Sequence, residues 1–139
     1  MRFRHAAAGA AIAALLAGAA RASSLPMDAP IKLGSVETVC TGIGEGKNDP
    51  RWRTYPVRVE FVDASARYIA GAHVSLTDVA GAPLAEFDCS GSWVLLKLPP
   101  GLYTVSARLT AATSAPVIAK FQPPQTGQSR VVLRFPAQP

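Results

Sequence analysis

Histidine and cysteine are scarce in this 139-residue chain, which contains only two of each. His5 lies in the N-terminal segment that we interpret below as a signal peptide, so His73 is the single histidine of the remaining chain. One histidine provides too few ligands for a zinc site, and no Ser-His-Asp arrangement stands out around it. The Cys-x-x-Cys pair typical of redox proteins is also absent. We therefore interpret His73 as a polar strand residue and expect no metal, no cofactor and no catalytic activity.

Long apolar runs are missing as well, except near the N-terminus. Arg2 and Arg4 precede an apolar stretch over residues 6–20, which ends in Ala20-Arg21-Ala22. A basic start, a short apolar run and a small-x-small site are typical of a secretory signal peptide. The run is shorter than the roughly 20 residues that cross a bilayer as a helix. We predict a signal helix over residues 1–22, cleavage before Ser23, no stable membrane insertion and a periplasmic or secreted product.

A strong charge of one sign is also lacking. Without Arg2, Arg4 and Arg21, eleven basic residues face nine acidic ones, and the formal net charge falls from +5 to +2. No basic run remains that resembles the footprint of a nucleic-acid-binding protein. We therefore do not expect a nucleic acid as partner.

The two cysteines, Cys40 and Cys89, both stand close to a glycine at the end of a strand-like segment. In an exported protein, an even pair of cysteines is most simply a disulfide. Closing a loop of this length stabilises the fold by about 4 kcal/mol in the chain-entropy model. We predict a disulfide between Cys40 and Cys89.

A turn at residues 98–103 is the most informative local pattern. Pro99 and Pro100 restrict the backbone, and Gly101 provides the positive φ of the third position in a type II turn. Alternating apolar residues precede and follow this turn, which predicts antiparallel strands on both sides. We expect Tyr103 to be buried, with its hydroxyl bonded to the backbone as in sandwich tyrosine corners.

Short segments in which apolar and polar residues alternate recur through the chain. After residue 22, no segment repeats its apolar residues at the 3.6-residue spacing of a helix. Between residues 54 and 63, Val57 and Phe61 share one face with their apolar neighbours, whereas Arg58 and Glu60 occupy the other. Seven or eight such strands with frequent turn signals predict an all-β, antiparallel β-sandwich of the prealbumin or immunoglobulin type. The expected strands cover residues 33–41, 54–63, 73–79, 84–88, 93–98, 102–110, 115–121 and 129–135. We predict an unpaired, flexible leader over residues 23–31, one domain over 32–136 and a tail over 137–139.

Residues 68–81 and 95–105 resemble the carboxypeptidase regulatory-like, or transthyretin-like, domains. The first range contains Gly-Ala-His-Val-Ser-Leu-Thr-Asp-Val-Ala-Gly, and the second contains Leu-Pro-Pro-Gly-Leu-Tyr-Thr-Val. The resemblance implies the sandwich fold, which many modules of different function share. Residues 40–45 and 89–92 are also similar to loops of small exported bacterial proteins of unassigned function. That second resemblance implies an envelope protein and supports the disulfide.

The loop over residues 42–53 is our candidate partner-binding segment, because sandwich domains carry binding residues on such loops. Its candidate contact residues are Glu45, Arg51, Trp52 and Arg53. Arginines clamp acidic groups, and an exposed tryptophan contacts sugars or proteins. The alternative for Trp52, which we favour, is that it folds back and caps one end of the sandwich.

The preferred functional hypothesis is a non-catalytic, exported module that binds an envelope protein or glycan. Two alternatives stay open: a structural accessory subunit that uses β-strand addition, and an unrecognised hydrolase. The sequence does not identify the partner or the oligomeric state.

Overall fold

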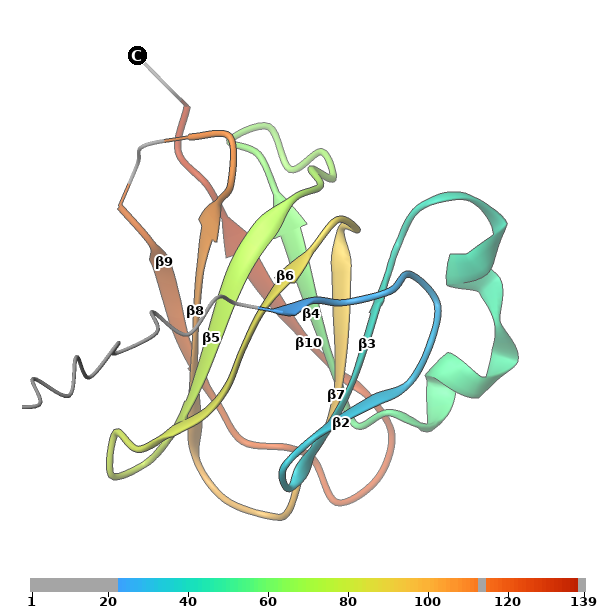
Figure 1. Cartoon of the computed structure of the whole chain (residues 1–139), viewed down its shortest axis with the longest axis vertical. Helices are drawn as coiled ribbons and strands as arrows, with labels where there is room; N and C mark the ends of the chain where they lie inside the picture. Colours follow the sequence, from blue (N-terminus) through green and yellow to red (C-terminus); the bar gives the residue numbers. More distant parts are fainter. Residues whose placement is uncertain (1–22, 113–114, 138–139) are drawn as a thin grey trace, which may run out of the picture.

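The computed structural model describes residues 23–112 and 115–137. Within these residues the protein is all-β except for two short 3₁₀ helices, and it contains two five-stranded sheets that face each other (Figure 1). The expected signal helix over residues 1–22 lies outside the described residues. No helix in the described ranges is long and apolar enough to span a membrane.

The first sheet, called sheet A, has the order β1-β6-β5-β8-β9. Its last four strands in that order form three antiparallel pairs. Its strands are β1 (Ser23–Ser24), β5 (Ala72–Asp78), β6 (Pro83–Cys89), β8 (Tyr103–Leu109) and β9 (Val117–Phe121). β1 is a short addition that runs parallel to β6. β9 ends the order, so one of its edges pairs with no other described strand.

The second sheet, called sheet B, has the order β10-β4-β7-β3-β2. Its strands are β2 (Ile31–Leu33), β3 (Val36–Thr41), β4 (Val57–Val62), β7 (Trp93–Lys97) and β10 (Ser129–Arg134). β10 pairs in parallel with β4, whereas the other pairs are antiparallel. The prediction of wholly antiparallel sheets is therefore wrong in part. The first and last strands of the described chain, β1 and β10, pair in parallel at the edges of the two sheets.

The core lies between the sheets and follows the alternation seen in the sequence. Val57, Val59 and Phe61 of β4 are fully buried, as are Leu76 and Phe87 of sheet A, each with 0–1% of its surface exposed. Successive strand residues point to opposite faces, so every second residue enters this core. The remaining residues of each strand cover the two outer faces of the molecule.

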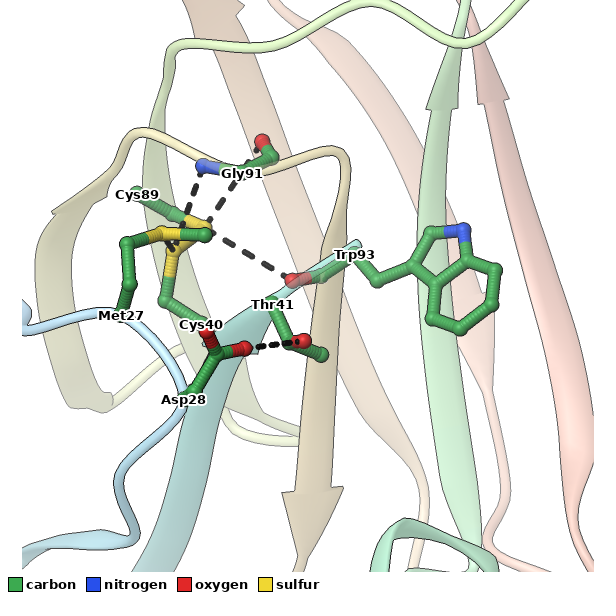
Figure 2. Close-up of a disulfide and its surroundings, with 7 residues drawn as sticks. All are labelled: Met27, Asp28, Cys40, Thr41, Cys89, Gly91 and Trp93. Carbon is green, nitrogen blue, oxygen red and sulfur yellow. Dashed lines mark hydrogen bonds between the residues drawn. A yellow bond between two sulfur atoms is a disulfide. The ribbon is translucent and has the colours of Figure 1, made fainter. Parts of the chain in front are cut away.

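A disulfide joins the two sheets, as predicted. Cys40 at the end of β3 bonds to Cys89 at the end of β6, with a Cα–Cα distance of 5.6 Å (Figure 2). Both cysteines are buried, with at most 1% of their surface exposed. The bond therefore ties sheet A to sheet B at one end of the core.

The described residues form ten strands rather than seven or eight. The segment expected as one strand over residues 33–41 divides into β2 and β3, because Gly34 adopts a left-handed φ of 61° and turns the chain. The prediction of an unpaired leader over residues 23–31 is wrong. Leu25 is 93% buried and its N–H donates to Asp88, while Asp28 accepts a 2.6 Å hydrogen bond from Thr41.

The turn between β7 and β8 is present, with a different backbone from the predicted one. Gly101 has φ 153°, far from the value of about 80° at the third position of a type II turn. The Tyr103 hydroxyl donates a 2.6 Å hydrogen bond to the Pro99 carbonyl, as expected for a tyrosine corner. The turn therefore keeps the predicted positive φ at Gly101, departs from type II geometry and is closed by the tyrosine.

Candidate functional site

The outer face of sheet B presents two rows of side chains that cross its strands. Strand register places Val39, Leu95, Arg58 and Arg130 in one row, and Thr41, Trp93, Glu60 and Val132 in the next. These residues alternate with core residues along each strand and therefore point away from sheet A. Figure 2 shows the Trp93 side chain extending away from the disulfide toward β4.

The loop after β3 folds back over this face as two 3₁₀ helices, η1 (Gly44–Asn48) and η2 (Pro50–Thr54). In Figure 1 they lie on the side of sheet B away from sheet A. Trp52 is 4% exposed and packs with Val39, Tyr55 and Leu95 in a small second apolar cluster. Its indole N–H donates to the Gly46 carbonyl at 2.7 Å. Trp52 therefore folds back onto the protein, which is the interpretation that the sequence favoured. It covers the outer face of sheet B rather than the end of the sandwich.

Tyr55 anchors the end of this loop to the sheet. Its hydroxyl donates to Glu37 Oε2 at 2.8 Å, and its ring packs edge-on against Trp52. Burial and the Glu37 carboxylate raise the pKa of Tyr55 to about 12. The same hydrogen bond lowers the pKa of Glu37, so this pair exists as a neutral phenol with a carboxylate at neutral pH.

Gln128, which precedes β10, fixes the loop from the other side. Its amide nitrogen donates to the carbonyls of Trp52 and Tyr55, at 2.9 and 3.0 Å. The loop is thus held by its own packed Trp52 and Tyr55 and by the amide of the distant Gln128. We conclude that its conformation is determined by tertiary contacts as well as by its own turns.

The two arginines that flank Trp52 have different surroundings. Arg51 pairs with Asp49 at 2.8 Å, and its guanidinium carbon lies 4.9 Å from the centre of the Trp52 ring. Hydrogen bonds from Arg51 lower the pKa of Asp49. Arg53 forms no salt bridge within residues 23–112 and 115–137 and lines a cavity under the loop. Of the predicted contact residues, Arg53 and Trp52 line this cavity, with Trp52 as a buried wall, whereas Glu45 and Arg51 do not line it.

This cavity, which we call the basic cavity, has a volume of about 220 Å³ and lies between the loop and the outer face of sheet B. Its cationic members are Lys47, Arg53 and Arg58, while the charge of Asp49 is already paired with Arg51. Its complete lining is Lys47, Asn48, Asp49, Trp52, Arg53, Arg58, Trp93, Leu95 and Gln128. The three cations make it suited to an anionic group.

Arg58 forms the inner cationic part of the basic cavity. Its guanidinium carbon lies 4.4 Å from the centre of the Trp93 ring, and its side chain is 24% exposed. Its Nε lies 3.6 Å from Glu60 Oε2, which is too long for a hydrogen bond, and it has no hydrogen-bond partner among the described residues. Arg58 therefore holds its position by stacking and charge while retaining an unused donor.

Glu60 is fully buried beneath this site, with 0% of its surface exposed. It accepts hydrogen bonds from Tyr68 and from Arg130, the latter through two guanidinium nitrogens. Burial by itself raises the pKa of Glu60, but these hydrogen bonds and the charge of Arg58 outweigh it and hold the pKa below its ordinary value. Glu60 is therefore a carboxylate at neutral pH, and its two oxygens are occupied by partners other than Arg58.

Sequence reasoning placed Arg58 and Glu60 on the outer face but singled out neither. The glutamate is buried because Tyr68 and Arg130 cover it, and both partners come from outside β4. The parallel pairing of β10 with β4 sets Arg130 opposite Arg58, in register. Nothing in the alternation of β4 indicates that pairing, so the signal is absent from the local sequence.

His73 lies on the outer face of sheet A, whereas the basic cavity lies on the outer face of sheet B. Its Nδ1 is 2.8 Å from Asp88 Oδ1 and its Nε2 is 2.7 Å from Glu86 Oε1. Both ring nitrogens are thus engaged by carboxylates of β6. Within the described residues, no group of three His, Cys, Asp or Glu side chains is arranged to hold a metal ion.

Neither a scan against protein-family models nor a search of curated proteins found a match for this chain. A functional proposal therefore has to rest on the geometry of the molecule.

Proposed function

We propose that this protein is a non-catalytic, exported β-sandwich module that binds an envelope protein or glycan through the basic cavity. The observation that carries the proposal is the gathering of Lys47, Arg53 and Arg58 around one 220 Å³ cavity. The loop above it is fixed by Trp52 and Gln128, so the site exists before a ligand arrives. Preorganised sites bind without the entropy cost of ordering a loop.

The finer description of the fold belongs to the same proposal. Two facing sheets, a tyrosine corner before β8 and the disulfide between the sheets are compatible with a transthyretin-like or carboxypeptidase regulatory-like sandwich. We propose that relationship on the residues quoted above. It would make the protein an accessory or binding module, because such sandwiches occur with many functions.

The absence of catalysis is proposed from the surroundings of His73. A histidine that serves as general base needs a ring nitrogen facing the group that loses its proton. Here both nitrogens face carboxylates, Asp88 and Glu86, so neither is directed at Ser75 or Ser106 nearby. A hydrolase built on His73 would first have to break one of these contacts.

Strand addition is the second candidate, and β9 is the observation that favours it. One edge of β9 pairs with no other described strand, and Ile118 on this strand is 61% exposed. A partner strand could extend sheet A there through backbone hydrogen bonds. Lys120 on the same strand acts against such pairing, since a charged residue on an edge discourages an added strand.

Retention on an isolated envelope fraction tests the proposal. The protein is purified from the exported pool of cells that express the full chain, and it is compared with Lys47→Gln and Arg53→Gln variants. Each variant removes one exposed cation of the basic cavity, and we expect it to weaken retention about fivefold or more. Arg134→Gln is the matched control, because Arg134 is an exposed arginine that does not line the basic cavity.

Equal retention of the wild-type protein and both cavity variants would refute the basic cavity as the binding site.

Export is tested in the same material by intact-mass measurement of the exported protein. We expect a product that begins at Ser23, and retention of residues 1–22 in that pool would refute the signal peptide.

A further inference from the structure

We infer that the basic cavity takes a single monosaccharide residue that carries one carboxylate, that is, a hexuronate residue of an acidic glycan. This inference rests on the proposed function and specifies its ligand. The argument from size comes first. A volume of about 220 Å³ is smaller than the 300–1,000 Å³ typical of sites for drug-sized molecules, so one sugar-sized group fits and an extended chain does not.

The charge of the cavity requires an anion. Lys47 and Arg53 are exposed and form no salt bridge among the described residues, while Asp49 gives both carboxylate oxygens to Arg51. Arg58 also lines the cavity, with its charge partly balanced by Glu60 at 3.6 Å, and its buried Nε has no hydrogen-bond partner among the described residues. Because Glu60 is saturated by Tyr68 and Arg130, it does not satisfy the Arg58 donor. Arginine presents its donors in a planar fork, which matches a carboxylate.

The neutral part of the lining requires hydroxyl groups on the same ligand. Gln128 lines the cavity and its nitrogen donates to two backbone carbonyls, while its side-chain oxygen accepts no hydrogen bond from the described residues and is available as an acceptor. Asn48 adds a second amide with both a donor and an acceptor. A hexuronate ring carries hydroxyls next to its carboxylate, which pair with these amides. An aspartate or glutamate side chain of a peptide carries its carboxylate on methylene groups and has no hydroxyls of its own, so only the peptide backbone could pair with these amides.

The apolar part of the lining fits the same ligand. Leu95 and the side of Trp93 form part of the wall, and sugar rings present C–H groups to such surfaces. The Trp93 ring is stacked under Arg58, so it does not offer an open face for a neutral sugar to stack on. Recognition therefore depends on the carboxylate, with the ring filling the remaining volume.

Titration of the exported protein with digalacturonate, followed by backbone amide chemical shifts, tests this inference. We expect saturable shifts at residues 47–53 and around Trp93, and about tenfold weaker binding for Arg53→Gln, because a charge-assisted hydrogen bond is lost. Arg134→Gln, which removes an exposed arginine outside the cavity, should bind like the wild-type protein. Neutral digalactose should cause no saturable shifts in this region.

Two further probes separate the alternatives. Binding of inorganic phosphate or of a short glutamate-containing peptide at the same residues, as tight as or tighter than digalacturonate, would overturn the assignment to an acidic sugar. So would absence of any digalacturonate binding. If envelope retention still depends on Arg53 while digalacturonate neither binds nor competes, the ligand is wrong and the proposed function stands. If retention does not depend on Arg53, both fail.

Discussion

Glu60 shows how a charged residue is accommodated in an apparently ordinary strand. It is fully buried on the outer face of sheet B because Tyr68 and Arg130 cover it and satisfy its oxygens. A buried carboxylate without such partners would be strongly destabilising. The burial of Glu60 therefore depends on both Tyr68 and Arg130. The same contacts keep a negative charge beside Arg58.

Replacing Glu60 by glutamine should expose this dependence. The amide keeps the shape of the side chain but loses the charge, so we expect Glu60→Gln to lower the free energy of unfolding by about 2 kcal/mol. Glu86→Gln is the matched control, because the Glu86 side chain is 55% exposed and should change stability by less than about 0.5 kcal/mol. Equal effects of the two substitutions in urea denaturation would contradict this account.

The pH dependence of stability follows from the same carboxylate. The pKa of Glu60 is lowered in the folded state from its ordinary value of 4.5. A lowered pKa contributes stability that is present above the ordinary value and is lost as the pH falls through the folded value. We expect the wild-type protein to lose stability between about pH 5 and pH 3, and Glu60→Gln to show a smaller loss over that range. Parallel stability curves would count against the role of Glu60.

Trp52 is the residue on which the sequence left two interpretations open. Because it is 4% exposed and packs with Val39, Tyr55 and Leu95, we expect Trp52→Ala to lower the free energy of unfolding by about 3 kcal/mol or more. Chemical denaturation measures this directly. A loss below about 1 kcal/mol with loss of envelope retention would restore Trp52 as a contact residue.

At the level of elements, alternation predicts the strands because each strand of this fold has one face in the core. The ranges expected from the sequence match β4 to β10 within a few residues. The two 3₁₀ helices were not predicted, because their conformation depends on Trp52 packing on sheet B and on the distant Gln128. The presence of Arg53 and Arg58 in one cavity was not predicted either, since residue spacing does not show that the loop folds back.

The disulfide between β3 and β6 provides the prediction at this scale. It joins residues separated by 49 positions, so it restricts the unfolded chain strongly. We expect the Cys40→Ala, Cys89→Ala double variant to lose about 4 kcal/mol of stability and to melt about 10 °C lower or more. Thiol labelling of the unfolded wild-type protein without reductant should find no free cysteine. A free thiol in that experiment would contradict the bond.

At the scale of the molecule, the two sheets use their outer faces differently. Sheet A carries His73 and its carboxylate partners, and it ends at the open edge of β9. Sheet B is partly covered by the loop over residues 42–53, and the basic cavity lies between this loop and sheet B. The fold class followed from the sequence, but the location of this cavity required the strand order and the packing of the loop. Binding at the cavity and binding at the β9 edge would therefore occur at separate places on the surface.

Hydrogen–deuterium exchange of the exported protein, with and without its envelope fraction, distinguishes these places most directly. The account predicts slower exchange in residues 44–58 and 93–95, which form the basic cavity, and unchanged exchange in β9. Arg53→Gln should abolish most of that protection, whereas Arg134→Gln, outside the cavity, should retain it. Protection confined to Val117–Phe121, with none around the cavity, would contradict the account and identify strand addition at β9 as the binding mode.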